Sequence, residues 1–334
     1  MEIKMGDCTL PCPLRGMHDV PEDFRVLRRL RLPDGQARRV DADEPRSSVM
    51  TDREMTGPVG RLDRDDVVGS VALEAGPPST SVGVVLDCET TGLDPATDVI
   101  IELAVRRIRY DRDGRILKID RLRSWREDPG RALSDEVARL TGLTDADLVG
   151  RMIDDDAATD LLKSADLVIA HNARFDRGFV ERRLPDAGGL AWACSCAEID
   201  WAASGFDGRS LGWLLAQAGW FHDGHRAGTD VDALVTLLSH PMADGRTALA
   251  ELIESAACPS VKVEAIGADI GVKDALRLRR YRWDPDVRLW WKEIPGAELT
   301  AEEFWLAANV YGIDRRARAM GPRLTEVTAR DRYL

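Results

Sequence analysis

The chain has 334 residues, 44% of them hydrophobic, and a formal net charge of -12 at pH 7. This length and apolar content allow a sizeable core, so we expect one main domain with smaller appendages. Non-specific coating of nucleic acid needs a broad basic surface, so the acidic balance excludes that mode and leaves local contacts, which metal ions could support. The six cysteines lack zinc-finger spacing, and no stretch approaches the roughly 18 apolar residues of a membrane span. We therefore expect a reduced, cytoplasmic protein with no membrane partner.

The first region, residues 1–80, mixes Arg, Asp, Pro and Gly with little periodicity, and we predict a poorly ordered extension there. A short alternating run at Phe24–Leu32 could form a small hairpin. Because Met50 and Met55 lie downstream, the extension could also be an artefact of start-site choice. A linker at Gly76–Ser79 separates this region from the next.

The second region, residues 81–257, alternates dense apolar runs with segments of helical spacing. The apolar runs predict five strands, the first three as an antiparallel meander, at Val82–Leu86, Val99–Ile108, Ile116–Leu122, Leu167–Ala170 and Trp192–Cys196. The helical spacing predicts helices at Ser134–Leu140, Asp155–Ser164, Arg174–Leu184, Ser210–Ala218, Asp230–Ser239 and Arg246–Ala257. The fold class is therefore α/β, with a mixed sheet flanked by helices.

The third region, residues 258–334, predicts a small C-terminal α+β unit. Its expected elements are a strand, a helix, a hairpin and a second helix, at Val261–Ile266, Val272–Arg280, Tyr281–Trp291 and Ala301–Tyr311. Residues 270–292 contain seven basic residues and three acids. Four aromatic residues lie among them, Tyr281, Trp283, Trp290 and Trp291. This pattern is typical of a single-strand nucleic-acid platform. At least two of the rings should instead form the unit's own core, and the unit could also dock a partner protein.

The first cluster of candidate functional residues lies at the end of the first predicted strand. Its sequence is Asp87-Cys88-Glu89-Thr90-Thr91-Gly92. Because strand side chains alternate, Asp87 and Glu89 point to one face and Cys88 to the other. Mg²⁺ and Mn²⁺ prefer carboxylate oxygen, and one carboxylate can bridge two ions. Paired acids at a solvated strand end are also common without a metal, but the preceding apolar run favours burial here.

The second cluster, His171–Asp176, follows the fourth predicted strand. Asn172 can cap the following helix, and Asp176 falls in its first turn, where the helix dipole favours a carboxylate. Both placements could therefore be structural. Phe175 suits either the core or a base-stacking surface.

The third cluster, His225–Asp230, is a loop histidine followed by an acid that opens a helix. A histidine can accept a proton from water near neutral pH, which makes His225 the candidate general base. An isolated loop histidine is often a surface residue, as the neighbouring His222 illustrates. The spacing to Asp230 selects His225 over His222.

In this order the three clusters resemble the motifs of the DEDDh exonucleases, the family of the proofreading epsilon subunit of bacterial DNA polymerase III. The resemblance covers roughly residues 80–240 and includes Leu140–Thr144. It implies a ribonuclease-H-like fold and a two-metal 3′-to-5′ exonuclease acting on the single-stranded 3′ end of DNA. Nucleoside 5′-monophosphates would be released during proofreading or repair, with a polymerase or another replication or repair protein as partner.

The same resemblance implies the role of each residue. Asp87 would bridge two Mg²⁺ or Mn²⁺ ions, Glu89 and Asp230 would complete the first ion's shell, Asp176 would hold the second, and His225 would deprotonate the attacking water. Substrate binding would involve Thr90, Thr91, Gly92, Leu93, His171, Asn172 and Phe175. Cys88 stands where many members have threonine, and Asp232 is an extra acid without an assigned role.

Electrostatics favours a metal site over a structural cluster. Two carboxylates about 4 Å apart repel by roughly 4 kcal/mol at an effective dielectric near 20, so four together would destabilise the fold without cations. One rival is a 3′-to-5′ exoribonuclease of the same family, because these residues do not report whether a 2′-OH is tolerated. Another is a catalytically silent binding or scaffold module, which would have no reason to keep such costly acids.

Overall fold

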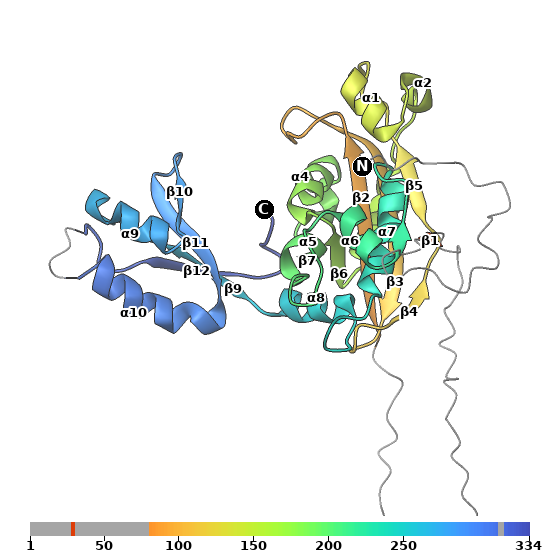
Figure 1. The fold of residues 1–334 in the computed structure, drawn as a ribbon. Coiled ribbons are helices and arrows are strands. Elements are labelled where there is room, and N and C mark those ends of the chain that lie inside the picture. The colour runs from red at the N-terminus through yellow and green to blue at the C-terminus, as the bar shows by residue number, and fades with distance from the viewer. Residues whose placement is uncertain (1–27, 31–79, 313–316) are drawn as a thin grey trace, which may run out of the picture.

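The computed structural model describes residues 28–30, 80–312 and 317–334, which contain two main sheets (Figure 1). The larger sheet has the order β4-β3-β2-β6-β7, with β5 also paired to β3. Its strands are β2 (Ser81–Thr90), β3 (Ile100–Tyr110), β4 (Ile116–Ile119), β5 (Arg123–Arg126), β6 (Leu167–Ala170) and β7 (Trp192–Cys194). The β2–β3 and β3–β4 pairs are antiparallel, which confirms the predicted meander, and β6 and β7 join in parallel.

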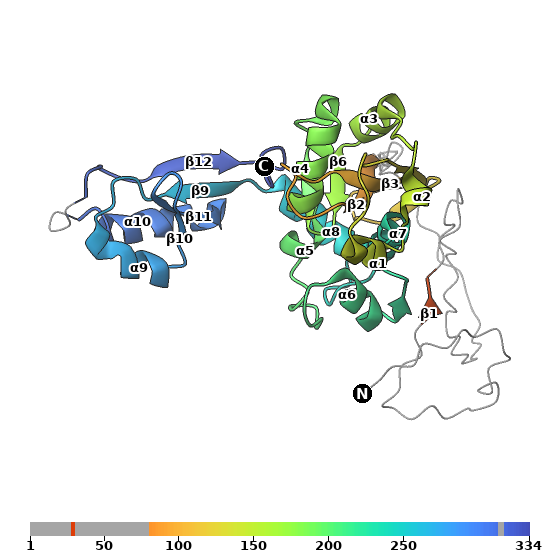
Figure 2. The same cartoon turned by 90° about the horizontal axis from the view of Figure 1, so that it is seen from above.

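Helices cover both faces of this sheet (Figure 2). Val84 and Leu86 of β2 pack on the side of α3 (Asp155–Lys163) and α4 (Ala173–Arg183). Val85 faces the other side, which is covered by α6 (Leu211–Gln217), α7 (Ala227–Leu238) and α8 (Ala248–Ala257). This alternation lets a strand buried on both faces read as a continuous apolar run. The predicted ribonuclease-H-like class, a mixed sheet flanked by helices, is confirmed.

Two of the shorter helices begin at capping side chains. In α1 (Asp135–Thr141), the Ser134 hydroxyl accepts a hydrogen bond from the Val137 amide at 3.2 Å, so the helix begins one residue later than expected. The helix α2 (Asp145–Leu148) is set by a capping box at Thr144, and α5 (Ser195–Glu198) follows β7 directly. None of the helices in the described ranges is long and apolar enough to cross a membrane.

The N-terminal predictions lie outside the described residues, apart from Arg28–Leu30. There, β1 (Arg28–Arg29) pairs in parallel with β8 (Trp220–Phe221), and the Leu30 amide donates to the Phe221 carbonyl at 3.0 Å. The hairpin proposed over Phe24–Leu32 stays a prediction, as do the domain boundaries after residues 80 and 257.

The second sheet forms the expected α+β appendage. Its strands are antiparallel in the order β10-β11-β9-β12, with bounds β9 (Ser260–Glu264), β10 (Arg282–Asp284), β11 (Leu289–Pro295) and β12 (Arg323–Val327). Two helices, α9 (Lys273–Leu278) and α10 (Leu299–Asn309), complete a β-α-β-β-α-β succession. Tyr281 and Trp290 pack in its core with Val263 and Ile294, so two of the four aromatic rings are core residues, as expected.

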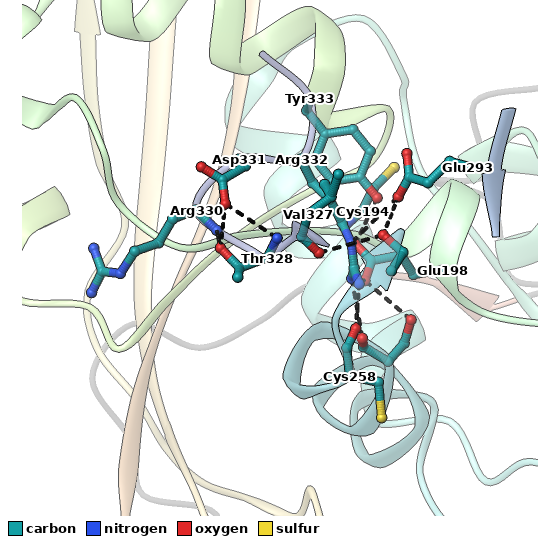
Figure 3. A network of polar contacts seen from close by, with 12 residues as sticks. Cys194, Glu198, Cys258, Glu293, Val327, Thr328, Arg330, Asp331, Arg332 and Tyr333 are labelled. Atoms are coloured by element: carbon teal, nitrogen blue, oxygen red, sulfur yellow. Dashed lines mark hydrogen bonds and ion pairs between the residues drawn. The ribbon is translucent and has the colours of Figure 1, made fainter. Parts of the chain in front are cut away.

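The chain then returns to the larger sheet after β12 (Figure 3). The Trp192 amide of β7 donates to the Ala329 carbonyl at 2.8 Å. The Arg332 guanidinium pairs with Glu198 at 2.7 Å, and the Tyr333 hydroxyl donates to the same carboxylate at 2.6 Å. Arg332 is 9% exposed, so this ion pair is buried. Two stretches of chain therefore connect the units, one entering β9 and one leaving β12.

Candidate active site

Three carboxylates meet where β2 ends against α7. Asp87 and Glu89 lie on one face of β2, as the alternation predicts, and α7 brings Asp230 to the same place in its first turn. One ligand oxygen from each of the three lies within 4.8 Å of the other two. Asp232 belongs to a different contact, because it forms an ion pair with the buried Arg106 guanidinium at 2.8 Å. This ion pair gives Asp232 a structural role.

The pKa values of these carboxylates are raised because the groups are buried and lie close together. Burial, followed by the neighbouring carboxylates of Asp176 and Asp230, raises the pKa of Asp87 well above its ordinary value. Burial and the Asp230 carboxylate raise the pKa of Glu89 to about 7. Either protons or cations would relieve this repulsion, and an all-oxygen donor set fits a hard divalent cation.

Asp176 approaches from the opposite side of β2. It lies in α4, and its Oδ1 accepts hydrogen bonds from the Cys88 amide at 3.1 Å and the Cys88 thiol at 3.4 Å. Burial raises the pKa of Asp176 to about 7. Asp176 is therefore beside the group of three rather than within it. Cys88 points to the opposite face of β2 from Asp87 and Glu89. The alternation of side chains along the strand could therefore have indicated that a residue contacting Cys88 comes from that face.

The histidine nearest the carboxylates is His222. Its Nε2 lies 2.7 Å from Oδ1 of Asp230, whose Oδ2 accepts from the Arg226 amide at 3.0 Å. The His222 side chain is 8% exposed, so the interpretation of this residue as a surface histidine is wrong. His225 is exposed and has a left-handed backbone with φ 64°. Its role as general base stays a prediction.

Glu102 is a buried acid beside the carboxylates that sequence reasoning missed. It lies opposite Glu89 in the β2–β3 pairing and is 3% exposed. Its carboxylate accepts from Arg226 Nε at 3.1 Å, from Arg226 Nη2 at 3.0 Å and from the Ala227 amide at 3.2 Å. These bonds fix the start of α7, between His225 and Asp230. The available signal was a lone acid inside the apolar run of β3.

The turn after β2 holds four of the predicted substrate-binding residues. The Thr90 hydroxyl donates to the Gly92 carbonyl at 2.5 Å, and the Thr91 hydroxyl donates to Asp98 at 3.0 Å. A Cβ at Gly92 would collide with the Asp98 carboxylate, so a larger residue there would displace the side chain to which Thr91 donates. Leu93 is 84% exposed. The turn is thus a braced loop that presents one apolar side chain to solvent.

The other three predicted substrate-binding residues begin α4 or precede it. His171 bonds to the Ser195 hydroxyl at 2.8 Å and the Arg209 carbonyl at 2.7 Å, and burial lowers its pKa. Asn172 occupies the N-cap position with φ 76°, but its side chain makes no capping bond, so that expectation is wrong. A capping side chain normally depends on an extended backbone, which Asn172 lacks. Phe175 packs against Phe179 at a centroid distance of 4.9 Å, so part of its ring serves the core. Substrate contact by these residues stays a prediction.

Comparison with known families agrees with this geometry. Residues 84–238 match the family model described as Exonuclease. This domain belongs to that exonuclease family. The match contains all five predicted catalytic residues and begins inside β2, and the likeness to DEDD exonucleases is confirmed at the level of the family.

Relatives of the exonuclease domain include proteins of two named kinds. The domain is 42% identical over 105 residues to a PolC-type DNA polymerase III from Oceanobacillus iheyensis, covering 30% of this chain and 7% of the polymerase. It is 30% identical over 115 residues to ribonuclease T from Shewanella oneidensis, covering 30% of this chain and 51% of the ribonuclease. The chain thus spans about half or less of these relatives. A solved structure of E. coli exonuclease I with single-stranded DNA has 16% identity and a TM-score of 0.44, covering 64% of this chain and 63% of that one.

Proposed function

We propose that this protein is a divalent-metal-dependent 3′-to-5′ exonuclease. It hydrolyses phosphodiester bonds at the single-stranded 3′ end of DNA and releases nucleoside 5′-monophosphates, in proofreading or repair. The observation that carries the proposal is the convergence of Asp87, Glu89 and Asp230, within 4.8 Å of one another, in an exonuclease-family domain.

The donor set fits two Mg²⁺ or Mn²⁺ ions. Asp87 belongs to the group with Glu89 and Asp230 and also interacts with the Asp176 carboxylate, and so is the residue that could bridge two ions. Glu89 and Asp230 would complete one ion's ligands, and Asp176 would hold the other, directly or through water. When bound, the ions supply positive charge that lowers the pKa of water and stabilises the leaving 3′ oxygen.

The remaining roles fall to groups of the chain itself. His225 would accept the proton of the attacking water, since it lies exposed at the loop that leads to Asp230. His222 and the Arg226 amide would hold the Asp230 carboxylate in one orientation. The terminal nucleotide would be seated by the braced turn with exposed Leu93 and by the N-terminal end of α4, where Phe175 offers a partly buried ring.

DNA is the favoured substrate because the higher identity is to the polymerase, and a polymerase is one candidate partner. The identity to ribonuclease T supports RNA as the second candidate. Purified protein incubated with matched 3′-single-stranded DNA and RNA oligonucleotides would decide between them. Mononucleotide release from DNA should exceed release from RNA, and EDTA should stop both. Faster release from RNA would overturn the DNA assignment.

Single substitutions test the site. Asp87→Ala should leave a folded protein without Mn²⁺-dependent degradation, and retained degradation would remove Asp87 from the site. His225→Ala should lower kcat far more than it weakens strand binding, while His222→Ala serves as its matched control and should lower kcat less. If His222→Ala abolishes turnover and His225→Ala does not, the general base has been assigned to the wrong histidine.

A further inference from the structure

The C-terminal sheet has one face covered by helices and one that carries none in the described part of the chain (Figures 1 and 2). Val263 of β9 and Ile294 of β11 face the covered side, where they pack with Leu276 of α9 and Leu306 of α10. Neighbouring positions on each strand must point to the opposite face. That open face has the two central strands β9 and β11 at its middle.

One cross-strand row runs across all four strands on the open face. The pairing register places Arg282, Trp291, Glu264 and Arg323 side by side, on β10, β11, β9 and β12 respectively. Trp291 is half-buried, whereas its neighbour Trp290 belongs to the core on the covered face. Core packing therefore accounts for Trp290 and leaves Trp291 without such a role.

Two cations lie close to the Trp291 ring. Lys262 Nζ lies 5.3 Å from the ring centroid and Arg282 Cζ lies 5.8 Å from it. Glu264 is buried and anchors two cations, pairing with Lys262 at 3.3 Å and with Arg323 at 2.5 Å. Arg282 forms no ion pair with any carboxylate in the described ranges. Lys262 and Arg323 are thus held in place by Glu264 before any ligand arrives.

The chemistry of this face suits a single nucleic-acid strand. A base can stack on an indole ring whatever its sequence, and guanidinium and ammonium groups alongside can meet the flanking phosphates. Four-stranded sheets with one open face bind single-stranded RNA through such aromatic platforms. Lys262, Arg282 and Arg323 share this face with the ring, so a strand could offer a base to the ring and phosphates to the cations.

We propose that the open face of the C-terminal sheet binds single-stranded nucleic acid, with a base stacked on Trp291 and phosphates at Lys262, Arg282 and Arg323. This site is separate from the carboxylate centre and goes beyond the hydrolysis proposed above. It would hold a strand whether or not hydrolysis occurs. Three phosphate contacts predict a log–log salt dependence of binding with a slope of about −2.

The test uses the full chain carrying Asp87→Ala, in EDTA, so that binding is measured without hydrolysis. Fluorescence anisotropy with a labelled thymidine oligonucleotide should show that Trp291→Ala raises Kd by about 5- to 150-fold, and that Trp291→Phe recovers part of the affinity. The matched control is Trp283→Ala, because Trp283 is 46% exposed on the neighbouring strand but points to the covered side with Trp290. Its Kd should stay unchanged.

Two outcomes would overturn the proposal. One is an unchanged Kd for Trp291→Ala in a variant whose circular dichroism and melting temperature match the parent. The other is equal weakening by Trp283→Ala, which would assign the effect to general damage of the unit. A competing RNA oligonucleotide of the same sequence distinguishes a DNA strand from an RNA strand. Because no turnover is measured, failure here would leave the proposed exonuclease activity standing.

Discussion

Replacing Glu89 with glutamine should stabilise the metal-free protein, and the gain should grow with pH. Burial and the Asp230 carboxylate raise the pKa of Glu89 from 4.5 to about 7 in the folded chain. Between these values the folded chain holds a proton that the unfolded chain has lost, so stability falls as pH rises through this window and stays low above it. At about 1.4 kcal/mol per pKa unit, the ionised side chain costs about 1 kcal/mol at pH 5 and about 3 kcal/mol at pH 8.

Urea unfolding in EDTA measures this cost. The free energy of unfolding of Glu89→Gln should exceed that of the wild type by about 2 kcal/mol more at pH 8 than at pH 5. The control is Glu136→Gln, because Glu136 is an exposed acid of α1 and its replacement should give no such pH dependence. A stability difference that is constant with pH, or a variant less stable than wild type at pH 8, would refute the claim that the carboxylates repel one another in the metal-free fold.

Three further predictions concern the metal, the start of α7 and the C-terminal tail. Excess Mn²⁺ should raise the melting temperature measured by scanning calorimetry, because a ligand at a hundred times its Kd stabilises the folded state by about 2.7 kcal/mol. An equal rise in the Asp87→Ala variant would contradict this prediction. Glu102→Gln should lower kcat because Arg226 loses its partner, and unchanged steady-state kinetics would exclude a positioning role. Arg332→Met should lower the free energy of unfolding by about 3 kcal/mol, because it leaves the buried Glu198 carboxylate without a counter-charge. An unchanged urea midpoint would show that this ion pair contributes nothing.

Strands and helices buried on the sheet could be predicted closely from sequence. The expected strand Leu167–Ala170 is β6 itself, and the expected helix Arg174–Leu184 is α4 shifted by one residue. A buried strand needs a continuous apolar run and a covering helix needs apolar residues at 3.6-residue spacing, so both leave a clear local pattern. The same logic placed Asp87 and Glu89 on one face at the end of β2.

Elements defined by distant partners left no such pattern. The strand β5, with sequence Arg-Ser-Trp-Arg, pairs only at the edge of β3, and β12 pairs with β9 about sixty residues earlier. Polar edge strands like these gain their conformation from pairing, which a local reading does not contain. The contact between His222 and Asp230 could not be predicted from spacing for a related reason. The contact of His222 with Asp230 depends on the path of a loop in which His225 adopts φ 64°.

The tail after β12 links the proposed strand platform to the helix that carries Asp176. Arg177, the next residue of α4, is 1% exposed and donates to the carbonyls of Arg330 and Arg332. Arg332 in turn donates to the Cys258 carbonyl, beside the stretch that enters β9 (Figure 3). These bonds hold the tail on α4 and beside the chain that enters β9, so the two stretches that connect the units lie next to each other. Since β12 ends at Val327 and the carbonyl of Arg330 is already bonded to Arg177, only a few residues separate the C-terminal sheet from the helix that carries Asp176.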